Sequence, residues 1–409
     1  MKKTNKGYKM KKILILGAGI YQVPLIKTAK RMGLYTIVAS IPGNYPGFEL
    51  ADKVYYENTT DYKRILSIAR KEKIDGIITT GTDVAVITIG RVCDTLGLSG
   101  LSFKAAEIAT DKLLMKSCYE KYGVRTAKFR KILFDNENYT SELAGLELPL
   151  MFKSVDSSGS RGITKVNSTE EFEEARNYVL DNTRSNYFIV EEYIEGEEFG
   201  AQAFVHNGEI QFILPHGDYV FKGDTGVPIG HFAPYNLSDD VIEDAKFQLR
   251  MAIDAMGLDD CAINADFILK DGKTYVLEIG GRSGATCLAE LVSIYYGYDY
   301  YEKILRTALG ETVDFSTSDG SPAEMFHGVP NASMLLMSDK DGIIKSQINR
   351  NTDNPDIVDI QFDYKPGDEV HKFKVGPHRI GHVITKGDTL DSALTALDTA
   401  ISNIEITVE

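Results

Sequence analysis

Residues 261–284 read CAINADFILKDGKTYVLEIGGRSG and place two acidic residues within apolar runs. Two β-type segments flank residues 270–272, a Lys-Asp-Gly sequence typical of a tight turn between antiparallel strands. If all three turn residues form the loop, Asn264 lies opposite Glu278, and Asp266 lies diagonal to Glu278 on the same face. A two-residue turn would place the two acids on opposite faces, because side chains alternate along a strand. We predict the three-residue loop and one shared polar face.

This acidic hairpin is a candidate metal site. Asp266 and Glu278 on one face repel each other unless a cation joins them. Mg²⁺ is commonly held by one or two carboxylates together with the phosphates of a substrate, and the predicted face reaches towards Arg282. The alternative is a solvated sheet face, which the surrounding apolar residues disfavour.

A glycine-rich segment, PLMFKSVDSSGSRGI at residues 149–163, joins a short strand to a loop of small residues. Strand alternation places Met151 and Lys153 on one face, where a thioether can pack against a purine and an ammonium can meet phosphates. The loop amides can donate to phosphate oxygens. The spacing is not that of a P-loop, because no Gly-Lys-Ser/Thr follows. Taken alone, the segment is more typical of a plain surface loop.

Residues 10–103 alternate short β-branched runs with helical patterns, which predicts a doubly wound parallel sheet. The run ILIL is apolar throughout, as expected for a strand covered on both faces. The Gly-Ala-Gly turn at 17–19 follows it and opens a helix, where backbone amides can meet an anion. The dinucleotide fingerprint is incomplete, because Gln22 replaces the third glycine and no acidic residue ends the second strand. We therefore rank NAD binding below a structural or substrate-side role for this turn.

The rest of the chain mixes strands and helices in three further units. It becomes strand-rich around a helical pattern at 238–257 and ends in another helical pattern. The expected boundaries of the four units are 10–103, 104–200, 201–310 and 311–409. The predicted fold class is mixed: an α/β unit with a doubly wound parallel sheet, two α+β subdomains and a small C-terminal unit.

Composition excludes several classes of function. The chain has 409 residues, 43% of them hydrophobic, and a net charge of −14. It is therefore globular and lacks the broad basic face that nucleic acids or anionic membranes require. No run of 18 apolar residues indicates a membrane span. The four cysteines have no CxxC or zinc spacing, which favours buried free thiols in a reducing cytoplasm. Residues 1–9 are expected to be a disordered tail or an upstream start.

In order along the chain, these segments resemble the ATP-grasp superfamily, and within it the carboxylate–amine ligases that include L-amino-acid ligases. TDK at 110–112 matches a position whose lysine contacts ATP phosphates, and VEEYIEGEEFGAQ at 190–202 is similar to the adenine hinge. RIGHVITKGDTLDSALTAL at 379–397 resembles the closing segment of the biotin-carboxylase-like branch. The resemblance implies a pre-ATP-grasp unit, a small and a large ATP-grasp subdomain, and a C-terminal subdomain, in that order.

The resemblance also implies roles for individual residues. Glu192 and Ile194 would read the purine edge through backbone groups, and Glu198 would bind the ribose hydroxyls. Asp266 and Glu278 match the magnesium ligands. The implied ATP-binding residues are Lys112, Lys153, Ser158, Gly159, Ser160, Glu191, Glu192, Ile194 and Glu198.

Two residues match the catalytic positions of the family. Arg282 matches the arginine that steadies the acyl phosphate, and His231 matches a histidine near the amine site. An imidazole can accept the proton of an attacking amine, while a hydrogen-bonded loop histidine is an equal alternative. The chain departs from the family pattern at Gly280, where many members carry asparagine. This departure bears on the second metal position, whose ligand would shift to Asn264 or to water.

The implied reaction has three steps: ATP phosphorylates a carboxylate, an amine attacks the acyl phosphate, and phosphate leaves. The expected cofactors are ATP and Mg²⁺, with Mn²⁺ as an alternative metal, and the substrates are a small carboxylate and an amine, with an amino acid or small peptide on at least one side. The loop at 157–162 is expected to close as a lid, because acyl phosphates hydrolyse. We expect a cytoplasmic protein without nucleic-acid or membrane partners. The sequence does not fix the oligomeric state, and a homodimer is common among the proteins that it resembles.

Two other functions stay open from the sequence. One is a bicarbonate-using carboxylase or carbamoyl-phosphate-type enzyme. The other is an NAD-binding protein or a non-catalytic nucleotide-binding protein.

Overall fold

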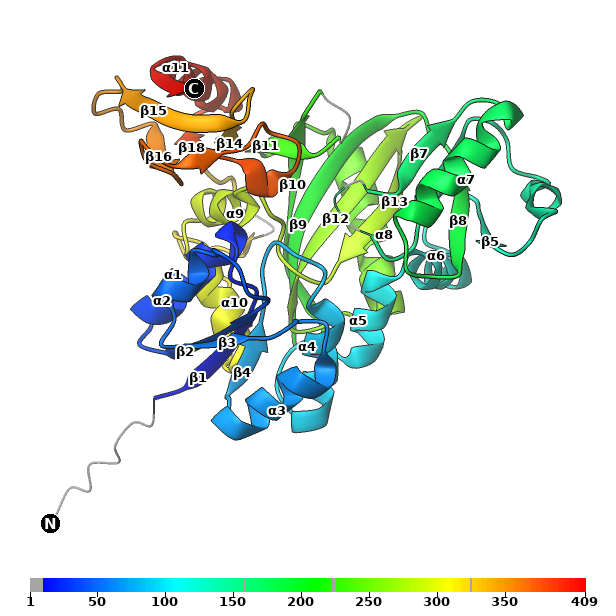
Figure 1. Ribbon diagram of the computed structural model, residues 1–409, viewed down its shortest axis with the longest axis horizontal. Helices are drawn as coiled ribbons and strands as arrows, with labels where there is room; N and C mark the ends of the chain where they lie inside the picture. The colour runs from blue at the N-terminus through cyan, green and yellow to red at the C-terminus, as the bar shows by residue number, and fades with distance from the viewer. Residues whose placement is uncertain (1–9, 158, 160, 223–225, 324–325) are drawn as a thin grey trace, which may run out of the picture.

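The computed structural model describes residues 10–409 apart from 158, 160, 223–225 and 324–325. The described residues form a four-stranded parallel sheet, an eight-stranded sheet, and two smaller sheets of four and three strands. Figure 1 shows the parallel sheet below, the C-terminal segments above it, and a small lobe on the opposite side of the eight-stranded sheet.

The N-terminal sheet has the order β3-β2-β1-β4, and all its strands are parallel. Its strands are β1 (Lys12–Leu16), β2 (Tyr35–Ser40), β3 (Lys53–Tyr56) and β4 (Gly76–Ile78), followed by or alternating with α1 (Val23–Arg31), α2 (Gly47–Leu50), α3 (Tyr62–Glu72) and α4 (Val86–Leu96). Ile13 and Ile15 pack into the core on the α1 side, whereas Leu14 and Leu16 pack into the core on the α3 and α4 side. All four are fully buried, so the predicted doubly wound sheet is confirmed.

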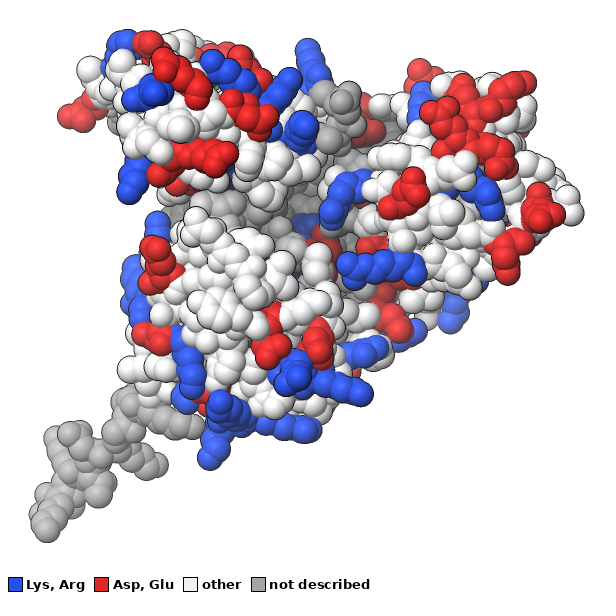
Figure 2. Space-filling view, viewed as in Figure 1, with Lys and Arg blue, Asp and Glu red and all other residues white. Residues whose placement is uncertain are grey.

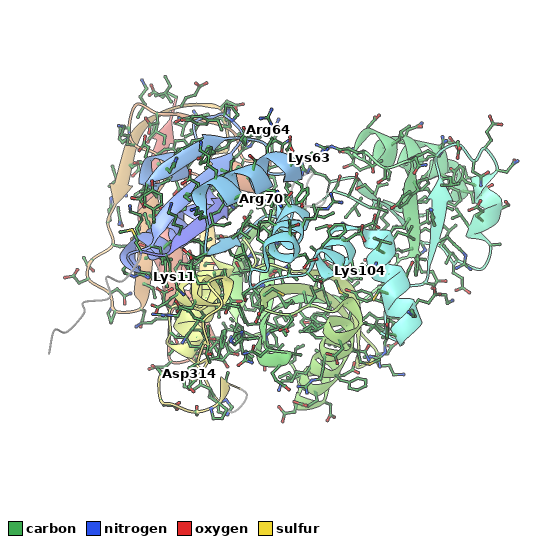
Figure 3. The ribbon with its side chains drawn as sticks, turned by 90° about the horizontal axis from the view of Figure 1, so that it is seen from below. Lys11, Lys63, Arg64, Arg70, Lys104 and Asp314 are labelled. Carbon is green, nitrogen blue, oxygen red and sulfur yellow. The ribbon has the colours of Figure 1, made fainter. Side chains whose placement is uncertain are left out.

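The exposed face of helix α3 carries several basic residues. Its buried residues include Ile65 and Ile68, which face the sheet. The basic residues Lys63, Arg64 and Arg70 alternate with them at helical spacing and project at the surface (Figure 3). The basic side chains therefore follow from the amphipathic pattern of a covering helix.

The small lobe contains the glycine-rich loop. Its antiparallel sheet has the order β5-β8-β6-β7. The elements are β5 (Phe129–Leu133), β6 (Leu150–Ser154), β7 (Ile163–Val166), α7 (Phe172–Asp181) and β8 (Tyr187–Glu192). The preceding helices α5 (Phe103–Thr110) and α6 (Lys112–Tyr122) pack in the core of the large sheet instead. Phe152 and Phe188 stack in its buried core with ring centroids 5.7 Å apart. The loop between β6 and β7 is thus attached to a rigid sheet at both ends.

The large sheet is antiparallel and has the order β13-β12-β9-β10-β11-β14-β18-β16. Its strands are β9 (Glu197–His206), β10 (Glu209–Val220), β11 (Pro228–Ala233), β12 (Cys261–Lys270), β13 (Lys273–Gly280), β14 (Asn331–Leu336), β16 (Ile357–Phe362) and β18 (Gly381–Lys386). Helix α8 (Asp239–Met256) packs on the face that carries Phe199 and Ala201. Helices α9 (Leu288–Tyr296) and α10 (Tyr300–Ala308) pack on the face that carries Phe204.

The C-terminal segment extends the large sheet. Strands β14, β16 and β18 lie beyond residue 310 but pair with β11 through β14. The remaining elements form a small sheet of β15 (Gly342–Asn349), β17 (Glu369–Val370) and β19 (Ile404–Val408), covered by α11 (Leu390–Ser402). The predicted unit boundaries remain a prediction, but the acidic hairpin and the C-terminal segment share one sheet.

Two further expectations concern thiols and membranes. All four cysteines are free, and Cys93, Cys261 and Cys287 are buried, while Cys118 is half-buried. In the described part of the chain, helices are too short or too polar to span a bilayer.

Candidate functional site

The acidic hairpin consists of β12 and β13, and its turn differs from the predicted one. Lys270 pairs with Lys273, so the loop has two residues rather than three. These residues, Asp271 and Gly272, have φ values of 51° and 71°, and two positive φ angles are what a type I′ turn requires. The predicted three-residue loop is therefore wrong.

A β-bulge nevertheless brings the two acids to the same face. The pairing shifts between Asp266 and Phe267, so that Asp266 lies directly opposite Glu278 and Asn264 opposite Gly280. The extra residue of β13 changes the phase of its side chains at this point. The shared face of Asn264, Asp266 and Glu278 is confirmed. However, Asp266 and Glu278 are direct rather than diagonal neighbours, and Asn264 lies opposite Gly280 rather than Glu278.

The negative charges of Asp266 and Glu278 are only partly balanced by the neighbouring Lys112. Burial, followed by the charge of Glu278, raises the pKa of Asp266 to about 7. Lys112 Nζ lies 3.3 Å from the Glu278 carboxylate. Burial alone would lower the pKa of Lys112, but the charge of Glu278 raises it above its ordinary value. The carboxylate oxygens of these two opposed acids are suitable ligands for a divalent cation, which would also reduce their mutual repulsion.

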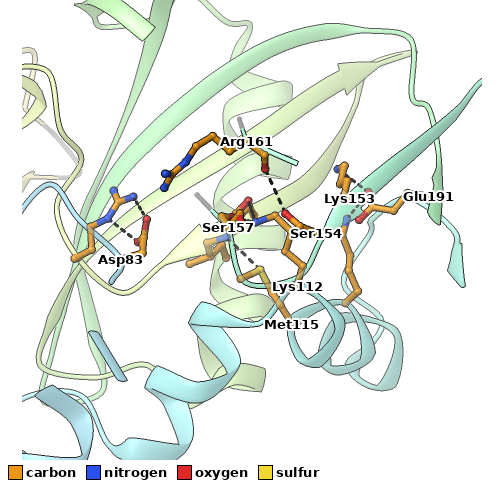
Figure 4. Close-up of polar contacts among 12 residues, drawn as sticks. Asp83, Lys112, Met115, Lys153, Ser154, Ser157, Arg161 and Glu191 are labelled. Atoms are coloured by element: carbon orange, nitrogen blue, oxygen red, sulfur yellow. Dashed lines mark hydrogen bonds and ion pairs between the residues drawn. The ribbon is translucent and has the colours of Figure 1, made fainter. Parts of the chain in front are cut away.

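Lys153 and Lys116 share one buried carboxylate, that of Glu191, and Figure 4 shows Lys153 beside it. Glu191 Oε2 lies 2.9 Å from Lys153 Nζ and 3.4 Å from Lys116 Nζ. Burial lowers the pKa of Lys116 to about 8 despite the opposing charge of Glu191. Among the described residues, Glu191 Oε1 is buried and accepts no hydrogen bond. Sequence reasoning missed Lys116, although its spacing of four from Lys112 places both on one side of α6.

The phosphate loop begins beside the first predicted ATP lysine. Lys112 Nζ donates a hydrogen bond to the Ser157 carbonyl at 2.8 Å (Figure 4). Gly159 has a φ of 68°, a left-handed conformation that suits glycine. Ser158 and Ser160 lie outside the described residues. The role of the loop in holding phosphates stays a prediction.

The predicted adenine hinge joins the two sheets. Strand β8 ends at Glu192 and β9 begins at Glu197, so Ile194 lies in the connection. The Glu192 N–H donates to the Lys128 carbonyl at 2.9 Å, which leaves the carbonyl as the backbone group that could contact a base. Glu198 is the second residue of β9 and pairs with Ile268 of β12.

Arg282 is held by a residue from the N-terminal unit. Its Nε and Nη2 donate to the two carboxylate oxygens of Asp83, both at 2.8 Å. A Cβ added to Gly280 would lie 3.2 Å from Asp83 Oδ1, so the Asp83 carboxylate borders the space that a side chain at 280 would occupy. Sequence reasoning missed Asp83; its position in the loop after β4, at the carboxyl end of a parallel strand, is the available signal.

His231 lies in a buried cluster with a second histidine. Asp218 in β10 is directly opposite His231 in β11. Asp218 Oδ1 lies 2.6 Å from His231 Nδ1 and 2.9 Å from His216 Nδ1. Burial lowers the pKa of His231 although Asp218 opposes this, so the imidazole is neutral at neutral pH. Asp218 was not singled out from the sequence, although its spacing of two from His216 puts both on one strand face.

The acids and the histidines form one row across the large sheet. The direct cross-strand pairs are Glu278–Asp266, Asp266–Gly200, Gly200–His216, Asp218–His231 and His231–Ser333. A Cβ added to Gly200 would lie 2.2 Å from His216 Cε1, so the missing side chain makes room for the His216 ring. Directly paired residues share a face. The predicted metal acids and the predicted amine-side histidine therefore lie on the same face of one sheet.

This row leads to a cavity of about 500 Å³. Ser333 pairs with Ile384, which lines the cavity. Lys27 and Arg31 of α1 and Glu290 of α9 also line it. The cavity thus offers both cationic and anionic side chains to a small molecule.

The side chain of Gln22 fills the space beside the N-terminal glycine turn at residues 17–19. Gln22 Oε1 accepts the Gly19 N–H at 3.0 Å, and Gln22 Nε2 donates to the Thr80 carbonyl at 2.6 Å. A Cβ added to Gly17 would lie 2.9 Å from Gln22 Oε1. These contacts support the structural role of this turn over a dinucleotide site.

The surface is hollowed between the small lobe and the rest of the molecule, with basic and acidic side chains inside the hollow (Figure 2). The site residues come from α6, β6, β8, β10, β11, β12 and β13, together with the loops that follow β4 and β13. Such an arrangement can hold an anionic ligand and a cation between two sheets.

Comparison with protein families gives two matches. Residues 146–290 match the ATP-grasp domain, and residues 334–409 match the L-amino acid ligase C-terminal domain 2. The alanine–anticapsin ligase of Bacillus subtilis (strain 168) is 24% identical over 286 residues. This match covers 63% of the chain and 60% of the ligase, so the chain spans about 60% of the length of that relative.

Two solved structures are similar over nearly the whole chain. Phosphoribosylglycinamide synthetase from Anaerococcus prevotii is 36% identical, with a TM-score of 0.83, covering 98% of this chain and 100% of the other. The biotin carboxylase domain dimer of the Hydrogenobacter thermophilus 2-oxoglutarate carboxylase, in complex with MgADP, ADP and bicarbonate, is 19% identical with a TM-score of 0.81. It covers 98% of this chain and 92% of the other, and at this identity it shares the fold alone.

Proposed function

The chain belongs to the ATP-grasp family, and on that premise we propose that it is an ATP-dependent, ADP-forming ligase that joins a carboxylate to an amine. The observation that carries the proposal is the row on one sheet face, with the opposed acids Asp266 and Glu278 towards one end and His231 towards the other. A phosphoryl-transfer site and an amine site on one surface are what such a ligation needs.

ATP would lie between the small lobe and the large sheet. Glu191 Oε1, an acceptor without a partner among the described residues, would take a hydrogen bond from the adenine amino group. Lys112 and Lys153 would meet the phosphates, with the amides of the glycine-rich loop. Phosphoryl transfer depends mainly on such positioning and charge stabilisation.

Asp266 and Glu278 would hold Mg²⁺. The fit rests on the raised pKa of Asp266, which burial and Glu278 cause and which an added cation would reverse. When bound, the metal neutralises the charge that develops on the transferred phosphoryl group. Gly280 supplies no ligand of its own, because it has no side chain.

Arg282 would stabilise the acyl phosphate and the oxyanion that forms when the amine attacks. Its Nε and Nη2 are fixed on Asp83, so the guanidinium is oriented before substrate binds. Losing a fixed donor of this kind typically costs about 3–4 kcal/mol in the barrier. His231, neutral because burial lowers its pKa, would take the proton from the amine.

The cavity beside the row suits a small zwitterion such as an amino acid. Its lining includes Lys27, Arg31 and Glu290, which match a carboxylate and an ammonium group. A second candidate follows from the 36% identity to a phosphoribosylglycinamide synthetase, whose name implies glycine as the carboxylate partner. A phosphoribosylated amine therefore belongs in the substrate screen.

The test is phosphate release from ATP with Mg²⁺, screened against amino acids singly and in pairs, glycine with phosphoribosylamine, and bicarbonate. We expect ADP and phosphate to form only when a carboxylate and an amine are both present. AMP with pyrophosphate, or turnover driven by bicarbonate alone, would contradict the proposal. Retained activity in Lys153→Ala and Glu278→Ala, with Lys246→Ala as a surface control, would remove the ATP-site assignment.

A homodimer is also part of the proposal, since the biotin carboxylase domain of similar fold is a dimer. Light scattering on the purified chain, with a mass near 45.3 kDa for a monomer, would decide the oligomeric state.

A further inference from the structure

The hydrogen bonds around His216 determine which of its nitrogens carries a proton. Gln202 Oε1 accepts the backbone N–H of Gly284 at 2.9 Å, so Gln202 Nε2 is the donor end of that amide. Gln202 Nε2 donates to Asn264 Oδ1 at 2.6 Å and lies 3.4 Å from His216 Nε2. His216 Nε2 must therefore be an acceptor, and its proton is on Nδ1, where it is donated to Asp218.

With this assignment both ring nitrogens of His216 have a partner, Gln202 Nε2 and Asp218, and His231 is the histidine that we place at the amine. His216 Nε2 already lies next to the amide donor Gln202 Nε2, so a proton on His216 Nε2 would point at an N–H of that amide. His231 Nδ1 is 2.6 Å from the same carboxylate oxygen. An Nδ1–H held by a carboxylate leaves Nε2 of that ring as the basic nitrogen.

The same three side chains could be read as a metal site, because their ligand atoms lie within 4.8 Å of one another. The distances decide against this. Ligands about 2.0–2.1 Å from a tetrahedral zinc ion are about 3.3 Å apart, whereas Asp218 Oδ1 lies 2.6 Å and 2.9 Å from the two imidazole nitrogens. These separations are those of charge-assisted hydrogen bonds.

The surroundings of His231 point to a reacting group on this face. His231 is 3% exposed and Ser333, directly opposite, is 1% exposed. Within the described residues, the Ser333 hydroxyl has no hydrogen-bond partner, although a buried hydroxyl normally has one. Ser333 pairs in turn with Ile384 at the cavity wall. An unsatisfied hydroxyl between the histidine and a cavity is suited to a polar group of a substrate.

We propose that Asp218 is a positioning residue that makes His231 the base for the attacking amine, while His216 shares the carboxylate and contacts Gln202 through its other ring nitrogen. The inference rests on the proposed ligase function and extends it to the second half of the reaction. The substrate amine arrives as an ammonium ion, and His231 Nε2 takes one proton so that the free amine can attack the acyl carbon. The acyl C–O bond then breaks, and the phosphate leaves with the bonding electron pair and takes the second proton from the nitrogen. Asp218 balances the imidazolium charge.

The experiment compares two nucleophiles in one assay. Hydroxylamine is unprotonated at neutral pH and captures acyl phosphates as hydroxamates without a base, whereas an ordinary amine substrate must first lose a proton. In Asp218→Asn and His231→Gln, we expect amide formation to fall about 100-fold or more, the usual range for general-base catalysis. Hydroxamate formation should change less than about threefold, because the phosphoryl-transfer half is intact. His216→Gln, which keeps a neutral donor towards Asp218, should lose less than about tenfold in amide formation.

The matched control is Asp341→Asn, which alters an exposed Asp–His pair, Asp341 with His371 at 3.2 Å, and should change neither product. Equal loss of amide and hydroxamate in Asp218→Asn would overturn the proposal by showing a structural role. Stoichiometric zinc in the purified protein that disappears in His216→Ala and His231→Ala would also overturn it. Absence of hydroxamate in the unsubstituted enzyme would instead reject the proposed ligase function itself.

Discussion

Asp83 and Arg282 form a two-point ion pair between segments 199 positions apart in the sequence, with both N–O distances at 2.8 Å. Asp83 belongs to the N-terminal unit and Arg282 follows the acidic hairpin. The parallel sheet therefore contributes directly to the orientation of the arginine that we place at the acyl phosphate.

Replacing Asp83 by alanine should impair catalysis more than ATP binding. A half-buried Arg282 without its partner loses both its fixed orientation and its charge balance. The loss of stability should stay below the cost of about 3–5 kcal/mol that is typical for breaking a fully buried pair. We expect kcat to fall about 100-fold, with the KM for ATP nearly unchanged. Steady-state kinetics together with urea unfolding would check this. Glu302→Ala, which removes an exposed pair with Arg306, is the control, and a similar loss in that variant would contradict the prediction.

A side chain at Gly280 should disturb the same pair. In Gly280→Ala the new Cβ would lie 3.2 Å from Asp83 Oδ1 and 3.6 Å from Arg282 Cζ. We expect a loss of about 1–3 kcal/mol in stability from this crowding, accompanied by lower kcat. A double-mutant cycle with Asp83→Ala should be non-additive, because both substitutions act on one ion pair. Strict additivity would show that the two sites are independent.

Lys116→Met should destabilise the contact between helix α6 and strand β8 of the small lobe. Lys116 and Lys153 both contact Glu191, and removal of one cation leaves the buried carboxylate with one partner. We expect a loss of about 3 kcal/mol, measured by chemical unfolding. Lys246→Ala removes an exposed pair with Glu243 and should cost less than about 1 kcal/mol. Equal effects in the two variants would argue against an energetic role for the buried cluster.

Stability should fall at alkaline pH, partly because of Cys93. Burial raises the pKa of this thiol from 9.0 to about 12. Between these values the unfolded chain loses the thiol proton while the folded chain keeps it, so the stabilisation is complete below pH 9 and decreases as pH rises. At pH 10 the loss from this group is about 1.4 kcal/mol. Cys93→Ala should reduce the difference in unfolding free energy between pH 7 and pH 10 by that amount, and an unchanged difference would count against it.

The hairpin illustrates how far the sequence alone could lead. The acids at 266 and 278, the turn between them and their common face were all predictable from apolar patterning and turn residues. The register was not, because the prediction assumed uninterrupted alternation. A two-residue turn and a bulge together reach the same face by a different path, and a bulge has no reliable sequence signal.

The residues that sequence reasoning missed share one property: their roles arise from contacts between distant segments. Asp83 meets Arg282, Lys116 meets Glu191, and Asp218 acquires its second histidine from the neighbouring strand. Each is an ordinary charged residue in its local sequence. The parallel sheet and the amphipathic helices, by contrast, follow from local periodicity, which is why they were predictable.

The continuous pairing from β13 to β14 has a mechanical consequence. The proposed metal ligands, Asp266 and Glu278, and the proposed base, His231, belong to one continuously hydrogen-bonded sheet. A hinge motion of the small lobe would therefore move Lys153 and its loop without changing the distance between the acids and the histidine. The distance between an acyl phosphate formed at the two acids and the amine site would then be set by the strand spacing, about 4.8 Å per strand. It would not depend on the position of the small lobe.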